Sequence, residues 1–346
     1  MVNYCKILFI IISFCFGKSN LKTFNINNET REYYLYTPSQ NNDDVALVFM
    51  LHGYTGSAST IMHYSKMNNF AEENGFFVCY PQGLVDSQGN SFWNVGYDFH
   101  KDQAVSDVEF LSALAKHIQD KYNISSDNTF SAGMSNGGEM SYMLGCQASD
   151  VFSGIASVTG IMFESFYKNC NPLPIPVLEI HGTEDDTNWW IGDPDNKGGW
   201  GNYIGIEEGI DFWKNINHCT ETAIDTFPNM SLSDSSFVIA ERHLNKIDNN
   251  AVWLYRIVNG GHDWPGSSGN MDINASEVVW DFFDEFSLSY SIGDVDYNGS
   301  INVSDILLIS DEVLFNMDYN YLSDWNGDDS VNINDVFAVL SVVLGF

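Results

Sequence analysis

Basic residues are scarce in this chain. Only 14 Lys and Arg stand against 46 Asp and Glu in 346 residues, which gives a formal net charge of −32 at pH 7. Nucleic acids and anionic membranes are polyanions and would be repelled, so this charge argues against both as partners. The composition is otherwise that of a folded protein, because 44% hydrophobic residues suffice for the core of one large domain and a small one.

The start of the chain also lacks an apolar segment long enough to span a bilayer. Lys6 is followed by an apolar run over residues 7–16 and then by the small residue Gly17. The run is too short to span a bilayer but suits the hydrophobic part of a signal peptide. We therefore expect a signal peptide over residues 1–17 and a secreted, extracellular protein, either free or retained at the cell surface or in a complex. A buried N-terminal strand or a retained anchor is the alternative.

Cysteines with metal-binding spacing are absent. Of the 6 cysteines, those beyond the expected signal peptide are Cys79, Cys146, Cys170 and Cys219, and none forms a C-x-x-C motif. This argues against a zinc site or a redox motif. In an oxidising compartment these cysteines allow about three complete pairings. We expect a disulfide between Cys146 and Cys170, because these two lie closest in sequence.

Apolar runs that end in glycine or turn residues follow one another along the chain. Unbroken runs are typical of strands buried on both faces, and they cover residues 45–53, 75–83, 128–135, 155–160, 176–182 and 251–261. Segments with helical spacing lie between them, at residues 60–74, 106–123, 137–147, 207–217 and 276–286. This alternation predicts an α/β fold with a mainly parallel, doubly wound sheet. Residues 21–38 predict an antiparallel hairpin at one edge of that sheet.

Ser135 is the strongest candidate for a catalytic residue. It is the second serine of SAGMSNGG (131–138) and the centre of a G-x-S-x-G motif. A chain of this composition contains about 0.2 such matches by chance, so the motif alone is weak. Here it lies between a predicted buried strand and a predicted helix, which is the setting of the nucleophile elbow in α/β-hydrolases. The flanking glycines are expected because side chains would clash in so sharp a turn.

A serine nucleophile needs a base and an acid that orients the base. In the α/β-hydrolase order the acid follows the serine and the histidine comes last. His262 fits as the base, because it lies in a glycine-rich loop directly after the last predicted strand. The strand at 176–182 is followed by Glu184, Asp185 and Asp186. We predict Asp185 as the acid, with Asp186 as the alternative.

Two backbone N–H groups are expected to stabilise an oxyanion. One belongs to the residue after the nucleophile, Asn136, and the other to the loop after the first central strand. That loop reads LHGYTG (51–56) and indicates Tyr54, with Thr55 as the alternative. An ordinary strand-end turn would explain the histidine and glycine of this loop equally well.

Several motifs occur in the order found in one family of secreted esterases. They are LHGYTGSAS, YPQG, FWNVG, SDVEFL, GMSNGGEMSYML, VFSGIASVTG, HGTED and GGHDWPG, and the likeness covers residues 24–286. In these motifs the chain resembles esterases related to polyhydroxybutyrate depolymerases and to the feruloyl and acetylxylan esterases of carbohydrate esterase family one. The resemblance implies an α/β-hydrolase domain over residues 18–288, a serine carboxylesterase without a cofactor, and Ser135, Asp185 and His262 as the triad.

The loop after the predicted acid departs from the family pattern. The family usually continues as D-P-x-V-P-Y, whereas this chain has DDTNWWIGDPDNKGGWGNY (185–203). Trp189, Trp190 and Trp200, together with Trp93 of FWNVG, are therefore candidate substrate contacts, because aromatic rings stack on sugars or on a feruloyl ring. Buried packing is the alternative for these tryptophans. The departure leaves polysaccharide and polyester substrates both open.

Two related segments follow a polar linker at residues 287–292. They begin at Asp294 and Asp324, and each is a polar loop that leads into an apolar helix. They resemble the calcium-binding repeats of a type I dockerin, which implies a small all-α domain over residues 293–346 and two structural Ca²⁺ ions. The implied ligands are Asp294, Asp296, Asn298, Ser300 and Asp305 in the first loop, and Asp324, Asn326, Asp328, Ser330 and Asp335 in the second.

The partner of this module stays open. Dockerins usually carry Ser-Thr pairs at loop positions 10 and 11 for their cohesin partner, whereas this chain has Val303-Ser304 and Ile333-Asn334. A cohesin-like protein and a cell-surface protein are both compatible with the sequence.

The sequence therefore predicts a secreted serine esterase that acts through an acyl-enzyme on feruloyl or acetyl esters of plant or algal polysaccharide. The dockerin-like module favours polysaccharide only by analogy of architecture. An extracellular polyhydroxyalkanoate or polyester depolymerase is the alternative among enzymes. A catalytically inactive binding or scaffold protein is the alternative of another class.

Overall fold

The computed structural model describes residues 17–40, 45–245, 250–287, 293–295, 301–315, 320–328 and 330–344. The expected signal peptide therefore lies, apart from Gly17, outside the described residues. Within the described ranges, no helix has the length and apolarity needed to cross a membrane.

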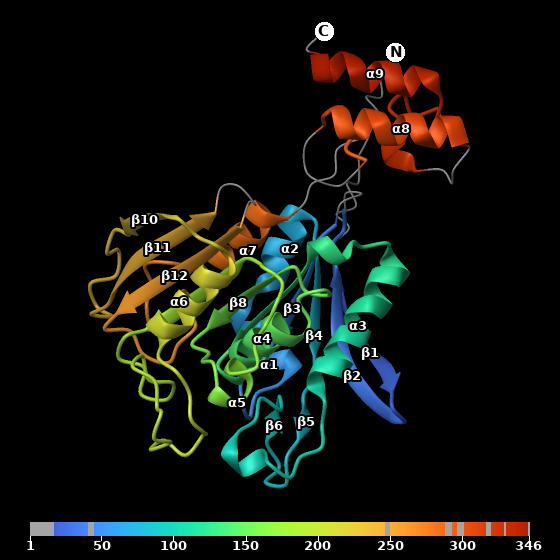
Figure 1. Ribbon diagram of the computed structural model, residues 1–346. Helices are drawn as coiled ribbons and strands as arrows, with labels where there is room; N and C mark the ends of the chain where they lie inside the picture. Colours follow the sequence, from blue (N-terminus) through green and yellow to red (C-terminus); the bar gives the residue numbers. More distant parts are fainter. Residues whose placement is uncertain are drawn as a thin grey trace, which may run out of the picture.

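A ten-stranded sheet forms the centre of the large domain, in the order β1-β2-β4-β3-β7-β8-β9-β12-β11-β10 (Figure 1). The strands from β4 to β12 in this order run parallel, and the strands at both edges pair antiparallel. The bounds are Lys18–Ile26 (β1), Glu29–Thr37 (β2), Leu47–Leu51 (β3), Phe77–Pro81 (β4), Thr129–Met134 (β7), Gly154–Val158 (β8), Val177–Gly182 (β9), Glu221–Thr226 (β10), Phe237–Asn245 (β11) and Asn250–Val258 (β12). A separate two-stranded hairpin is formed by Leu84–Val85 (β5) and Ser91–Phe92 (β6).

The predicted parallel strands and the N-terminal hairpin are confirmed. β1 and β2 pair antiparallel, and the turn between them places Asn27 at φ 51° and Asn28 at φ 64°. Asparagine tolerates this left-handed region better than most residues, and two such residues are what a tight hairpin turn requires.

Within the ten-stranded sheet, β10 and β11 were not predicted from the sequence. Every residue of β10 is exposed, and β11 alternates between more and less buried positions. Neither strand therefore has the unbroken apolar run that marks a strand covered on both faces. They extend the sheet beyond β12 as an antiparallel edge.

Helices cover both faces of the sheet. Leu47, Phe49 and Leu51 of β3 pack into the core beneath α3, α4 and α6, whereas Val48 and Met50 pack on the opposite face beneath α1, α2 and α7. The prediction of a doubly wound α/β sheet is thus confirmed. The bounds are Ala58–Ser65 (α1), Met67–Asn74 (α2), Asp107–Tyr122 (α3), Asn136–Gln147 (α4), Glu164–Tyr167 (α5), Ile206–Ile216 (α6) and Ala275–Phe286 (α7).

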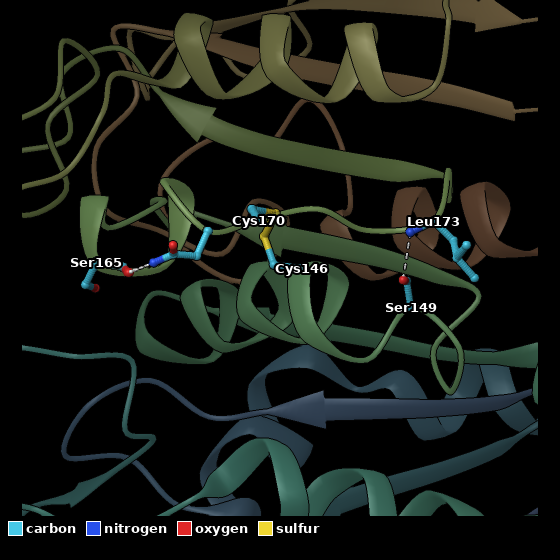
Figure 2. Close-up of a disulfide and its surroundings, with 6 residues drawn as sticks. Cys146, Ser149, Ser165, Cys170 and Leu173 are labelled. Carbon is cyan, nitrogen blue, oxygen red and sulfur yellow. Dashed lines mark hydrogen bonds between the residues drawn. A yellow bond between two sulfur atoms is a disulfide. The ribbon is translucent and has the colours of Figure 1, made fainter.

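The predicted disulfide is present. Cys146 near the end of α4 is bonded to Cys170, which follows α5, with their Cα atoms 4.8 Å apart (Figure 2). Cys79 and Cys219 are free. The bond ties the helix that begins beside Ser135 to the segment that leads into β9.

Helices α8 (Val303–Phe315) and α9 (Ile333–Leu344) belong to the C-terminal repeats. They bury a small core of their own, formed by Val295, Ile309, Leu322, Val336 and Val339. The predicted arrangement of two loops, each leading into an apolar helix, therefore agrees with the part of these repeats that the structure describes.

Candidate active site

The predicted catalytic residues follow three parallel strands of one sheet. Ser135 follows β7, Asp185 follows β9 and His262 follows β12, and β8 fills the gap between β7 and β9. Backbone hydrogen bonds continue beyond the strand ends, from Ser135 N to Val158 O (2.8 Å) and from Thr183 N to Ile257 O (2.9 Å). The three loops therefore leave the same edge of the sheet, where open α/β sheets place their binding sites.

Ser135 lies on a strained turn. Its φ of 53° and ψ of −121° are unusual for a residue with a side chain. The glycines on either side are required by sterics: a Cβ on Gly133 would lie 2.4 Å from the carbonyl carbon of Gly137, and one on Gly137 would lie 2.1 Å from Leu51 O. The backbone thus has the geometry expected of a nucleophile elbow.

Asp185 is the acidic residue that reaches His262. The distance between Asp185 Oδ2 and His262 Nδ1 is 2.7 Å. Asp185 Oδ1 accepts the N–H groups of Thr187 (2.9 Å) and Asn188 (2.8 Å), which fix the carboxylate. Asp186, the alternative from the sequence, is exposed and interacts with the hydroxyl of Thr187 (3.3 Å).

Burial and charge act on Asp185 in opposite directions. The side chain of Asp185 is fully buried and that of His262 is 19% exposed. Burial raises the pKa of Asp185. The hydrogen bond and charge of His262 and the charge of His181 together lower it by more, so the pKa of Asp185 lies below its usual range. Asp185 is therefore an ionised hydrogen-bond acceptor at neutral pH, as the orienting acid of a triad must be.

The two residues predicted to supply the oxyanion-hole amides differ in exposure: Asn136 is fully buried, whereas Tyr54 is partly exposed. Among the described residues, neither the N–H of Tyr54 nor that of Asn136 has a hydrogen-bond acceptor. The alternative donor, Thr55 N, is already bonded to Ser91 O at 2.8 Å. A Cβ on Gly53 would lie 3.5 Å from Ser135 Cβ, so the Tyr54 loop passes beside the serine.

Trp93 lies beneath the site and not on its surface. Its side chain is fully buried, its indole N–H donates to His52 O (2.9 Å), and its ring lies 5.0 Å from that of His52. The sequence offered Trp93 as a candidate substrate contact with buried packing as the alternative, and the structure bears out the buried packing. Its indole bond to His52 O supports the loop that carries Tyr54, and both of its polar backbone groups bond to the side chain of Asn136.

The other predicted tryptophans are partly exposed and lie in different surroundings. The ring centroid of Trp200 lies 5.9 Å from that of Tyr54 and 5.1 Å from that of Tyr97, next to the predicted oxyanion loop. Trp190 is covered by the guanidinium of Arg256 at 4.6 Å. Trp189 donates its indole N–H to Asp186 O (3.0 Å). Of the three, Trp200 is the one whose ring contacts Tyr54.

His52 holds the predicted oxyanion loop in place. Its Nε2 accepts the N–H of Gly83 (3.0 Å), so its Nδ1 carries the proton and donates to Gly53 O (2.8 Å). Burial lowers the pKa of His52 to about 4. The ring is therefore neutral at physiological pH and fixes the carbonyl that precedes Tyr54. The histidine and glycine that the sequence could explain as an ordinary strand-end turn thus support the loop that carries Tyr54.

Buried polar side chains that the sequence did not indicate connect the site. Asn188 donates its side-chain N–H groups to Glu139 Oε1 (3.1 Å) and Thr159 O (2.6 Å). Glu139, on α4, also accepts the hydroxyl of Tyr97 (2.6 Å). Burial raises the pKa of Glu139 to about 7 despite these hydrogen bonds. Asn188 therefore links the loop of Asp185 to the helix that begins after Ser135.

The C-terminal loops fold around the aspartates at their twelfth positions. Asp335 accepts the N–H groups of Asn326 (3.2 Å) and Asn332 (2.8 Å), and Asp305 likewise accepts those of Val295 (2.7 Å) and Asn302 (2.8 Å). Their hard oxygen donors suit Ca²⁺. The predicted ligands Asp296, Asn298 and Ser300 lie outside the described residues. Among those described, no group of three or more His, Cys, Asp or Glu side chains is gathered as for a metal.

Comparison with known proteins gives a family match for part of the chain. Residues 31–174 match the family described as "Esterase PHB depolymerase". The chain is 27% identical over 247 residues to feruloyl esterase B of Piromyces equi, an alignment that covers 70% of this chain and 42% of that protein. It is 26% identical over 156 residues to the bifunctional acetylxylan esterase/xylanase XynS20E of Neocallimastix patriciarum, covering 45% of this chain and 22% of that protein. The chain thus spans less than half the length of these relatives.

Among solved structures, the chain is similar to the acetyl xylan esterase from Aspergillus awamori. The TM-score is 0.54 at 15% sequence identity, and the alignment covers 77% of this chain and 99% of that one. The large domain has the α/β-hydrolase fold. The sequence relatives named here are esterases, and the likeness to the solved structure shows the fold.

Proposed function

We propose that this chain is a serine carboxylic ester hydrolase that works through an acyl-enzyme. The observation that carries the proposal is the 2.7 Å contact between Asp185 and His262 at the sheet edge where Ser135 occupies its strained turn. Asp185 binds Nδ1 of His262, so the proton of the neutral imidazole is held there and Nε2 is left as the base.

The proposed reaction gives each of these groups one role. His262 Nε2 takes the hydroxyl proton of Ser135 as Oγ attacks the ester carbonyl carbon. The tetrahedral oxyanion is stabilised by the N–H groups of Tyr54 and Asn136 at the N-terminus of α4. His262 gives its proton to the departing alcohol, and water, activated by the same imidazole, cleaves the acyl-enzyme.

Esters of plant or algal polysaccharide, with feruloyl or acetyl groups, are the proposed substrate class. The similar proteins named feruloyl esterase and acetylxylan esterase support this proposal. A groove of about 340 Å³ supports it as well, because Asp98, Lys101, Lys168 and Asn202 lie in its lining. Sugars carry many hydroxyl groups, which suits a lining of polar and charged side chains.

The groove lies next to the tryptophan-rich loop. Asp98, in its lining, donates its N–H to Trp200 O (2.9 Å), and Gly201 is so close to Phe163 that an added Cβ would lie 3.3 Å from its ring. Trp200 in turn contacts Tyr54. A polymer chain in the groove would thus extend away from the carbonyl bound at the oxyanion hole, with Trp200 between them.

Activity on methyl ferulate, acetylated xylan and polyhydroxybutyrate tests the substrate class. We expect hydrolysis of one or both polysaccharide-type esters and a raised KM for acetylated xylan in Trp200→Ala, with Trp189→Ala as the matched control in the same loop. Hydrolysis of polyhydroxybutyrate alone would favour the polyester depolymerase that the family description also fits. Equal inertness of wild type and Ser135→Ala towards p-nitrophenyl acetate would leave only the binding or scaffold protein.

The C-terminal repeats are proposed to bind two Ca²⁺ ions and to dock the secreted enzyme to a cohesin-like or cell-surface protein. The similar hydrogen bonds of Asp305 and Asp335 in the two loops support this proposal. Titration of the EGTA-treated full chain with CaCl₂ in a calorimeter tests it. We expect two ions per chain for the wild type and one for Asp335→Ala, and absence of binding heat would contradict the calcium sites.

A further inference from the structure

A second histidine lies directly behind Asp185. His181, on β9, is fully buried, with Nδ1 2.8 Å from Glu179 Oε1 and Nε2 2.8 Å from Asn188 O. The same Nε2 lies 3.5 Å from Asp185 Oδ2. The other oxygen of Glu179 accepts the hydroxyl of Tyr142 (2.9 Å). None of these groups except Asp185 takes part in the reaction described above.

The hydrogen-bond partners of His181 determine how many protons the His181–Glu179 pair holds. A backbone carbonyl can only accept, so Nε2 must carry a hydrogen for Asn188 O. The contact between Nδ1 and Glu179 Oε1 needs a second proton, because an unprotonated nitrogen facing a carboxylate would be repelled. A neutral histidine beside an ionised glutamate has only one proton for these two contacts, so the buried pair holds one more.

We propose that His181 is an imidazolium paired with ionised Glu179, and that this pair positions Asp185 for catalysis. The inference rests on the proposed esterase function. His181 acts through Asn188: its Nε2–H holds the Asn188 carbonyl, while the N–H of Asn188 donates to Asp185 Oδ1 at 2.8 Å. Asp185 is thereby held between a positioning histidine and the catalytic one.

The electrostatic surroundings agree with the additional proton. Burial lowers the pKa of His181, but the hydrogen bond and charge of Glu179 and the charge of Asp185 raise it overall. Burial raises the pKa of Glu179 as well. The other groups around the pair are Tyr142 and Glu139 of α4, His262 of the loop after β12, and Arg256 of β12, which lies over Trp190.

Nuclear magnetic resonance of the full chain with ¹⁵N-labelled histidine tests the protonation state directly. We expect His181, assigned by comparison with His181→Gln, to show both ring nitrogens protonated from pH 6 to pH 9. In Glu179→Gln the amide can donate to Nδ1, so His181 should become a neutral imidazole. A neutral His181 in the wild type at pH 7, or an unchanged imidazolium in Glu179→Gln, would overturn the proposal.

Kinetics test the positioning of Asp185. In His181→Gln the positive charge near Asp185 is lost, so Asp185 stabilises protonated His262 more strongly. The acidic limb of the kcat/KM profile on p-nitrophenyl acetate should move to higher pH, by about half a unit or more. We expect kcat to fall about 10- to 100-fold with KM nearly unchanged, because the loop carrying Asp185 loses its support.

Two further variants make the kinetic result interpretable. Glu179→Gln retains the hydrogen bond from His181 to Asn188 and should shift the acidic limb in the same direction with a smaller loss of kcat. His243→Gln alters another buried histidine, on β11, and should leave the profile unchanged. If the acidic limb does not move in either His181→Gln or Glu179→Gln, the positioning role is wrong. Inertness of the wild type would instead contradict the proposed function and leave the resonance result standing.

Discussion

Trp93 and Asn136 exchange two hydrogen bonds across the base of the site. The backbone N–H of Trp93 donates to Asn136 Oδ1 (2.7 Å), and Asn136 Nδ2 donates to Trp93 O (3.0 Å). Asn136 supplies one oxyanion N–H in the proposed mechanism, and Trp93 supports the loop of the other through His52. One pair of residues thus links both sides of the oxyanion hole.

Asn136→Ala should weaken both the fold and the catalysis. It leaves the buried N–H and C=O of Trp93 without their partners, which costs about 2 to 4 kcal/mol of unfolding free energy. The oxyanion donors lose their alignment, so kcat should fall about 100-fold. Urea denaturation and kinetics on p-nitrophenyl acetate measure the two effects. Full activity in Asn136→Ala would contradict a link through this side chain.

His52 should make the protein less stable in mild acid. The unfolded histidine gains its proton near its ordinary pKa of 6.5, whereas burial delays protonation of folded His52 to a pKa of about 4. Between these values the unfolded chain binds more protons, so stability falls as the pH falls, by about 3 kcal/mol. His52→Gln retains an acceptor for Gly83 N–H but does not titrate. The unfolding free energy of His52→Gln should therefore fall less than that of the wild type as the pH is lowered. Identical curves of unfolding free energy against pH for the two proteins would contradict this assignment.

Glu139 should have the opposite effect. Burial raises its pKa from 4.5 to about 7, so between these values the folded state binds more protons than the unfolded one. Stability from this group is fully present below pH 4.5 and is lost as the pH rises through 7, by about 3 kcal/mol. The stability difference between wild type and Glu139→Gln should thus favour wild type more at pH 4.5 than at pH 8. Glu277→Gln on the exposed face of α7 is the control, and a pH-independent difference for Glu139→Gln would contradict this expectation.

The Cys146–Cys170 disulfide should stabilise the large domain. Its sequence separation of 24 residues predicts a loop-closure contribution of about 3 kcal/mol. The Cys146→Ala/Cys170→Ala double variant should lose about this amount in urea denaturation. Cys219→Ala removes a free cysteine and serves as the control. A double variant as stable as wild type would show that the bond adds little to stability.

The sequence predicted the parts of the fold that are buried on both faces, because those strands are unbroken apolar runs. It missed β11, whose partly exposed residues interrupt the pattern, and β10, which is exposed throughout. The single predicted helix at 60–74 is two helices, since Lys66 adopts a φ of 51° between α1 and α2. A local left-handed residue other than glycine leaves no mark in hydrophobic spacing.

The order of residues along the chain was enough to predict the pairing of Asp185 with His262, but not the groups that hold it. Glu139, His181 and Asn188 are polar residues in segments whose spacing predicts only strand, helix or loop. Their burial depends on contacts between β9, α4 and the loop after β9, which are formed in the folded chain alone. For the same reason the sequence left Trp93 open between substrate contact and buried packing, because composition cannot distinguish a buried indole from an exposed one.

Covalent labelling of Ser135 tests the central claim most directly. The full chain is incubated with phenylmethylsulfonyl fluoride, digested and analysed by mass spectrometry, while hydrolysis of p-nitrophenyl acetate is followed in parallel. We expect one sulfonyl group on the peptide that contains Ser135, loss of activity in proportion to labelling, and neither labelling nor activity in Ser135→Ala. Activity that persists in the labelled protein, or in Ser135→Ala at the wild-type rate, would contradict Ser135 as the nucleophile.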